Sequence, residues 1–218
     1  MRNQKVNDCD LKNIDKPHRL FVTGIGTNVG KTVVSAILTE HLKADYWKPV
    51  QSGDLLDSDT LTVKKLVTNN QTVFHNERFR LSKPLSPHAA AKLDHESIQL
   101  SDFVVPSTSN HLVIEGAGGV LVPLNEGLLL ADLIKHVQAK VVVVSQIYLG
   151  SINHTLLTIE ELKRRNIDIL GIVFNGEYTP ETENFILHHT TIPVLFRIDK
   201  EEKITSDIIS SYASSFSL

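Results

Sequence analysis

The chain has 218 residues, of which 41% are hydrophobic and 22% are charged, so it is long enough to bury the core of one domain. Its net charge of −3 at pH 7 is unlike the strongly basic surfaces that bind nucleic acids, so any anion should bind locally, in a loop. We therefore expect small-molecule partners, with no nucleic acid and no membrane.

The first residues carry charges throughout and contain no apolar run, which argues against a signal peptide or a membrane anchor. We predict a flexible extension over residues 1–18 and a single domain over residues 19–218. The lone cysteine, Cys9, lies in this extension and cannot form an internal disulfide. It fits a reducing compartment, so the expected location is cytoplasmic.

Apolar, strand-like runs alternate with helical patterns along the rest of the chain. Strands are predicted at 20–23, 46–50, 112–114, 141–144, 169–174 and 193–196, and helices at 32–42, 60–67, 129–137, 151–165, 181–188 and 204–212. Several of the strands are apolar on successive residues, as strands buried on both faces are. The alternation predicts a single α/β domain, a parallel sheet with helices on both faces.

The segment from Gly24 to Thr32 joins the first predicted strand to the first helix and has the composition of a phosphate-binding loop (P-loop). Its glycines let backbone amides point toward an anion, and the helix N-terminus adds about half a positive charge. Lys31 would supply an ammonium for the outer phosphates, and Thr32 a hydroxyl of the kind that binds magnesium. The loop is a variant, because Ile25 stands where the common pattern has a glycine five residues before Gly30.

Polar residues also follow the other predicted strands, at the sheet edge where parallel sheets bind ligands. Lys48 and Ser52 lie near the end of the second strand, Glu115 ends the third, and Asn175 follows the fifth. Lys48 could neutralise charge on transferred phosphoryl oxygens, although a strand-end lysine can also simply extend to water. Glu115 leads into a glycine-rich loop, where a carboxylate commonly meets magnesium.

Asp59 has two interpretations that the residues alone leave open. It lies just after Asp57 and Ser58, either of which could cap a helix that starts there. Its carboxylate could instead bind a metal ion.

These features follow one another as they do in the dethiobiotin synthetase family, which the chain resembles from about residue 20 to residue 175. The matching segments are Phe21-Val22-Thr23-Gly24 with Thr27, Val29-Gly30-Lys31-Thr32, Lys48-Pro49-Val50 with Ser52-Gly53, Ser58-Asp59, Ser86-Pro87-His88, Glu115-Gly116-Ala117-Gly118-Gly119, Pro123-Leu124, Leu149-Gly150 with Ile152-Asn153-His154, and Asn175. The resemblance implies a ligase of biotin biosynthesis that acts at the penultimate step. In this family 7,8-diaminononanoate takes up CO2 as a carbamate, ATP phosphorylates the carbamate to a carbamic-phosphoric anhydride, and the second amine closes a ureido ring to give dethiobiotin, ADP and phosphate.

The resemblance also implies a role for each matching residue. Lys31 and Lys48 would be catalytic. ATP and Mg²⁺ would be held by Asn28, Val29, Gly30, Lys31, Thr32, Val33, Asp59, Glu115, Gly116, Ala117, Gly118, Asn175 and Gly176, with Thr32, Asp59 and Glu115 around the metal and Asn175 at the adenine edge. The diamine or its carbamate would contact Thr27, Lys48, Ser52 and Gly118, and its distant carboxylate would lie across a homodimer interface against Leu149, Gly150, Ser151 and Asn153 of the partner subunit.

Three departures from the family pattern limit what the resemblance implies, one of them being the N-terminal extension, to which the resemblance assigns no role. Asn28 is uncharged where some relatives carry an acidic residue, and residues 194–199 lack the Gly- and Pro-containing strand end of the family's base-binding loop. The preference for ATP over other nucleotides is therefore left open by the sequence.

A partition-type or septum-site-type ATPase, which uses ATP to control partner binding, is the alternative interpretation. Such ATPases share the expected fold and dimer, but their phosphate-binding loop typically has Lys-Gly-Gly before the Gly-Lys-Thr. This chain has Gly26-Thr27-Asn28 there. A P-loop protein that binds nucleotide without chemistry is a third class, and the retained Lys31, Thr32 and Glu115 argue against it.

Overall fold

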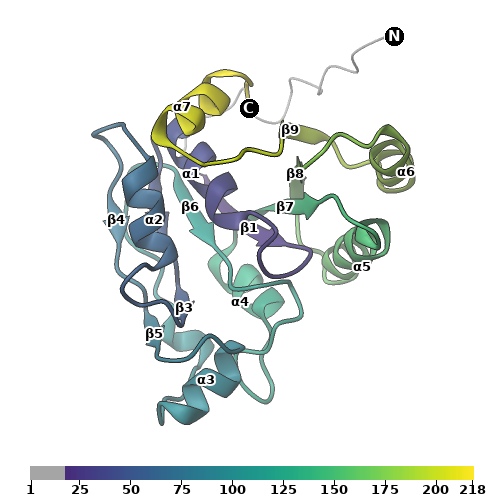
Figure 1. Ribbon diagram of the computed structural model, residues 1–218. Helices are drawn as coiled ribbons and strands as arrows, with labels where there is room; N and C mark the ends of the chain where they lie inside the picture. The colour runs from purple at the N-terminus through teal and green to yellow at the C-terminus, as the bar shows by residue number, and fades with distance from the viewer. Residues whose placement is uncertain (1–17) are drawn as a thin grey trace.

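The structure, a computed structural model, describes residues 18–218. The predicted extension lies outside the described residues apart from His18, and so does Cys9. Seven parallel strands form one sheet in the order β4-β2-β6-β1-β7-β8-β9, with β1 at its centre (Figure 1). The strands are β1 (Arg19–Gly24), β2 (Asp45–Trp47), β4 (Phe74–His75), β6 (Leu112–Glu115), β7 (Lys140–Gln146), β8 (Ile169–Asn175) and β9 (Val194–Ile198).

Helices cover both faces of this sheet, which confirms the predicted α/β fold. They are α1 (Lys31–Leu42), α2 (Asp59–Leu66), α3 (Pro87–Leu93), α4 (Leu130–Val137), α5 (Ser151–Arg164), α6 (Pro180–Thr190) and α7 (Ser206–Ser214), with a short 3-10 turn η1 (Leu100–Asp102). Within residues 18–218, no helix is both long and apolar enough to span a bilayer.

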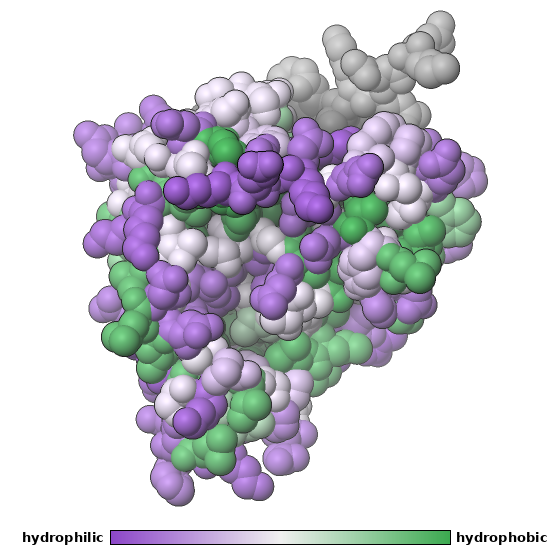
Figure 2. Space-filling view, in the orientation of Figure 1, coloured by the Kyte–Doolittle hydropathy of each residue, from purple (hydrophilic) through white to green (hydrophobic). Residues whose placement is uncertain are grey.

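The two faces of the sheet bury separate cores, because side chains alternate along each strand. On β1, Leu20 and Val22 pack with buried residues of α1, α2 and α7, while Phe21 packs with those of α3, α4, α5 and α6. Hydrophilic residues and smaller apolar areas are interspersed over the surface seen in Figure 2. Since both faces of the sheet are covered, ligands are expected at the loops beyond the carboxyl ends of its strands.

The prediction of one strand over residues 46–50 was wrong. The chain forms β2, breaks at Lys48-Pro49, and continues as β3 (Val50–Ser52), which pairs with β5 (Phe79–Leu81) in a separate two-stranded sheet. Pro49 has no amide to donate to a ladder, and its carbonyl instead accepts from the amide of Phe79 at 3.0 Å. The break turns the chain between the two sheets and leaves Lys48 at the junction.

Four further elements, β4, β5, α3 and the short η1 turn, were missed from the sequence. β4 has only two residues and β5 three, too few for a periodic pattern. α3 begins at Pro87, which suits the first turn of a helix because its missing amide would have no partner there.

Replacing Phe21 by alanine tests the importance of the central strand. Phe21 is fully buried, so Phe21→Ala should lower the free energy of unfolding by about 3–5 kcal/mol, measured by urea denaturation. Phe185, which is half exposed on α6, is the matched control, and Phe185→Ala should cost less than about 1 kcal/mol. Equal losses for the two variants would contradict this assignment of the core.

Candidate active site

The loop between β1 and α1 has the backbone of a phosphate-binding loop. Gly30 precedes the helix at φ 97°, and Asn28 also has a positive φ of 59°. The side-chain amide of Asn175, at the end of β8, donates to the carbonyl of Val29 at 2.9 Å. The loop is thereby tied to a neighbouring strand end, and the α1 N-terminus faces the sheet edge where an anion can bind.

Lys31 is the first residue of α1 and is buried, with its ammonium on the carbonyl of Gly26 at 3.0 Å. Burial, followed by the positive charge of Lys48, lowers the pKa of Lys31 to about 8. Phosphate oxygens would favour the charged form of this amine. Lys31 is thus placed to exchange a carbonyl of its own loop for a phosphate.

Four side chains from four parts of the fold meet beside this loop. The hydroxyl of Thr32 lies 3.0 Å from Oδ1 of Asp59 and 3.0 Å from Oε1 of Glu115. The Lys48 ammonium lies 2.6 Å from Oδ2 of Asp59 and 3.0 Å from Oε1 of Glu115. It also donates to the carbonyl of Gly116 at 3.1 Å. We call Thr32, Lys48, Asp59 and Glu115 the lysine-carboxylate cluster.

Lys48 and Glu115 are buried, Thr32 and Asp59 are half-buried, and the charges of the cluster depend on one another. Burial alone would lower the pKa of Lys48, but Glu115 and Asp59 raise it above its ordinary value. Burial would raise the pKa of Asp59, whereas the Lys48 charge and hydrogen bond hold it below its ordinary value. Lys48 is therefore a cation and Asp59 an anion over the physiological range of pH.

Tyr46 contacts Glu115 of the cluster. The sequence did not indicate this contact, because Tyr46 was only part of a predicted strand. Its hydroxyl donates to Oε2 of Glu115 at 2.9 Å, so both oxygens of that carboxylate have partners. Burial and the Glu115 charge raise the pKa of Tyr46 well above its ordinary value, which keeps it a donor. Tyr46 lies on β2, two residues before Lys48. Side chains two residues apart in an extended chain point to the same side, and this spacing was the signal in the sequence that could have identified Tyr46.

The donor set of the cluster suits Mg²⁺. Asp59, Glu115 and Thr32 offer two carboxylates and a hydroxyl, and Mg²⁺ is commonly held by one or two carboxylates together with phosphates and water. The Lys48 ammonium already lies between the two carboxylates, so their oxygens converge on a cation. Within residues 18–218, no group of three or more His, Cys, Asp or Glu side chains is placed to bind a metal ion by itself.

The glycine-rich loop after β6 packs against the phosphate-binding loop. Gly118 has φ 73°, and a Cβ added there would lie 3.7 Å from the hydroxyl of Thr27. A Cβ at Gly119 would lie 3.2 Å from the carbonyl of Gly24. Thr27 and Gly118, both predicted to contact substrate, are thus neighbours. Ser52 ends β3, and its hydroxyl is buried with no hydrogen-bond partner among residues 18–218.

The residues predicted to meet a substrate carboxylate form a separate loop after β7. Gly150 precedes α5 at φ 105°, Ser151 is fully buried with an unpartnered hydroxyl among the described residues, and Leu149 is fully exposed. Asn153 lies on the first turn of the same helix. None of these four residues shares a described hydrogen bond with the lysine-carboxylate cluster. The structure does place them at the same edge of the sheet, because the amide of Ile147 donates to the carbonyl of Asn175 at 2.9 Å.

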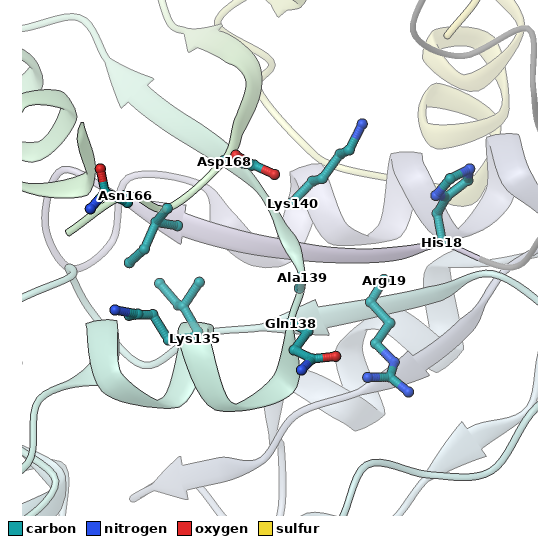
Figure 3. Close-up of a pocket in the computed structure, with 10 residues that line it drawn as sticks. His18, Arg19, Lys135, Gln138, Ala139, Lys140, Asn166 and Asp168 are labelled. Atoms are coloured by element: carbon teal, nitrogen blue, oxygen red, sulfur yellow. The ribbon is translucent and has the colours of Figure 1, made fainter. Parts of the chain in front are cut away.

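A cavity of about 550 Å³ lies at the opposite edge of the sheet, where β1 and β7 begin (Figure 3). Arg19, Lys135 and Lys140 line it, but Figure 3 shows their charged ends pointing in different directions. Arg19 also donates to the carbonyl of Val137 at 3.0 Å. The convergent polar groups expected of a reaction site therefore lie at the phosphate-binding loop and not in this cavity.

The chain is similar in sequence to known proteins over most of its length. A protein-family model described as an AAA domain matches residues 18–207. The chain is 52% identical over 196 residues to the ATP-dependent dethiobiotin synthetase of Cytophaga hutchinsonii, which covers 89% of this chain and 95% of that protein. It is 51% identical over 200 residues to the enzyme of the same name from Christiangramia forsetii, covering 92% of this chain and 96% of that protein.

Solved structures share the fold at low sequence identity. A ParA family ATPase from Chlorobium tepidum superposes with a TM-score of 0.52 at 11% identity, covering 91% of this chain and 98% of that one. The MinC:MinD cell division complex of Aquifex aeolicus gives 0.54 at 13% identity, covering 89% and 86%. At such identities the likeness establishes the fold alone.

Gly30→Ala tests the phosphate-binding loop. A Cβ at φ 97° is strained and would collide with the Asn175 side chain, so nucleotide affinity should fall by roughly tenfold or more, measured by titration with a fluorescent ADP analogue. Gly127→Ala is the control, because its added Cβ would meet only Asn125 at 3.9 Å. Unchanged affinity in Gly30→Ala would remove this loop from the nucleotide site.

Proposed function

Because the chain belongs to the dethiobiotin synthetase family, we propose that it is the ligase that closes a ureido ring on 7,8-diaminononanoate with CO2 and ATP. The observation that carries the proposal is the lysine-carboxylate cluster beside a phosphate-binding loop, in a chain that is 52% identical to a named synthetase. Dethiobiotin, ADP and phosphate are the expected products, and the reaction belongs to biotin biosynthesis. The cytoplasm remains the predicted compartment.

The proposed reaction runs in three steps. One amine of the diamine adds to CO2 and loses a proton, giving a carbamate. A carbamate oxygen attacks the γ-phosphorus of ATP and displaces ADP, giving a carbamic-phosphoric anhydride. The second amine then attacks the carbonyl carbon, the C–O bond to phosphate breaks, and the amine proton leaves with the phosphate. These steps need positioning and charge stabilisation and no covalent enzyme nucleophile.

Lys48 and Lys31 are the proposed catalytic residues. The Lys48 ammonium would hold the carbamate oxygen and neutralise charge on the γ-phosphoryl group, while the Lys31 ammonium would move from the Gly26 carbonyl to the outer phosphates. Thr32, Asp59 and Glu115 would hold Mg²⁺, which supplies charge neutralisation at the phosphates when it is bound.

The remaining proposed contacts position the substrates. The amides of residues 28–33 would cradle the phosphates, residues 116–118 would close over them, and Asn175 with Gly176 would meet the base. Thr27, Ser52 and Gly118 would hold the reacting end of the diamine, and the unpartnered Ser52 hydroxyl supports that role. In the proposed homodimer, residues 149–153 of the partner subunit would bind the distant carboxylate at the N-terminus of α5.

The partition-type switch is the second candidate function. The fold likeness to ParA and MinD proteins is compatible with it, but rests on 11–13% identity. No contact in the described residues favours it over the synthetase.

The decisive experiment incubates the purified protein with diaminononanoate, bicarbonate, ATP and Mg²⁺. Dethiobiotin detected by mass spectrometry, in step with ADP, is the expected result. ATP hydrolysis that does not depend on the diamine and gives no dethiobiotin would overturn the proposal and favour the switch.

Lys48→Met should lower turnover by roughly 100-fold or more while nucleotide binding persists, because a transition-state charge loses its partner. Initial rates of ADP release that depend on the diamine would measure this. Removing Lys48 also leaves Asp59 and Glu115 without their cation, so the assay is run well below the melting temperature of the variant. Lys65→Met, at an exposed surface pair, is the control. A fully active Lys48→Met variant would exclude Lys48 from the chemistry.

Glu115→Gln should raise the Mg²⁺ concentration needed for half-maximal rate by roughly tenfold or more, because a neutral amide replaces a metal-binding carboxylate. The measurement is the rate of dethiobiotin formation across a Mg²⁺ titration. Glu160→Gln changes an exposed glutamate and serves as the control. An unchanged Mg²⁺ dependence in Glu115→Gln would take Glu115 out of the metal site.

A further inference from the structure

Gln51 is a buried amide on β3 whose two polar atoms are both used. The residue is 6% exposed. Its Oε1 accepts from the backbone amide of Asp59 at 3.2 Å, and its Nε2 donates to the carbonyl of Gly53 at 3.0 Å. The side chain therefore links two segments that the site requires together.

The first segment is the turn after β3, which carries Ser52. Gly53 has φ 72°, and its amide donates to the carbonyl of Leu81 on β5 at 2.8 Å. A Cβ at Gly53 would lie 2.7 Å from Pro84, so the turn is tightly packed on that side. The Gln51 amide holds the same turn through the carbonyl of Gly53.

The second segment is the start of α2, where Asp59 is the first helical residue. The amides of a first helical turn have no partner within the helix and need one from outside. The Ser58 hydroxyl accepts from the amide of Leu61 at 3.4 Å, and Gln51 accepts from that of Asp59. Gln51 thus fixes the backbone from which the Asp59 carboxylate reaches Lys48 and Thr32.

We infer that Gln51 is a positioning residue that holds the metal-binding Asp59 and the substrate-binding Ser52 in one fixed arrangement. The inference rests on the proposed function, because it takes Asp59 as a metal ligand and Ser52 as a substrate contact. Gln51 touches neither ligand itself. Its loss should weaken metal binding and diamine binding together, and leave the phosphate-binding loop intact.

Gln51→Met tests this inference with little change in side-chain volume. The readout for metal is a titration of the protein–ADP complex with Mn²⁺, followed by electron paramagnetic resonance, which needs no turnover. The dissociation constant for Mn²⁺ should rise roughly three- to tenfold, as expected for a lost hydrogen bond, while ADP affinity without metal stays unchanged. Gln71→Met, at an exposed glutamine of the loop before β4, should change neither value.

The second readout is the KM for the diamine against kcat at saturating metal. Gln51→Met should raise this KM roughly three- to tenfold, with a smaller change in kcat, because the catalytic lysines stay in place. A purely structural role would instead lower the melting temperature and the fraction of active protein, without moving KM or the Mn²⁺ constant.

Gln51→Glu separates the two contacts. A carboxylate still accepts from the Asp59 amide but cannot donate to the Gly53 carbonyl, so Mn²⁺ should bind at least as tightly as in the natural chain while the diamine KM rises. If Gln51→Met does not fold, this variant carries the test. Unchanged Mn²⁺ binding and diamine KM in folded Gln51→Met would overturn the inference, and so would Mn²⁺ binding in Gln51→Glu as weak as in Gln51→Met. If the natural chain forms no dethiobiotin, the proposed function fails, yet the Mn²⁺ titrations still judge Gln51.

Discussion

The Lys48 ammonium is buried between the carboxylates of Asp59 and Glu115, and much of the local fold is explained by the need to keep it there. A charge taken out of water costs several kcal/mol unless partners of opposite sign replace its hydration. Both carboxylates must therefore reach the same point, although they lie on different elements. β6 ends in Glu115, α2 begins at Asp59, and β2 stops just before Lys48, so that three segment ends share one position.

The same arrangement explains why the charges of the site remain available for chemistry. Asp59 and Glu115 hold Lys48 charged, whereas Lys31 is buried beside that charge and has a pKa of only about 8. The two lysines therefore differ in the partners of their ammonium groups. Lys48 has its counter-ions, while the Lys31 ammonium has the Gly26 carbonyl as its hydrogen-bond partner within residues 18–218, and an arriving phosphate is the anion that would satisfy it.

The sequence predicted the parallel sheet and the protein family well, because the signals for both lie within short segments of the chain. Buried parallel strands are continuous apolar runs, and a phosphate-binding loop needs glycines and a lysine within a few residues; the α/β fold and the dethiobiotin synthetase family are both confirmed. The break at Lys48-Pro49 was missed because an apolar run alone does not show where a strand changes sheet. The contacts of Tyr46 with Glu115 and of Gln51 with Asp59 were missed because these partners are found only once the chain has folded. The assigned roles of the site residues stay predictions.

The junction between the two sheets limits which changes of chain length the protein tolerates. From Asp45 to Ser52 the chain leaves one sheet and enters another with only Lys48 and Pro49 between the two strands, and side chains alternate between opposite faces of a strand. One inserted or deleted residue here would turn Lys48 away from the carboxylates, or carry Tyr46 off Glu115. Between α3 and β6, by contrast, residues 94–111 include only the η1 turn, so length variants among descendants of this sequence are expected to accumulate there and to be purged between 45 and 52.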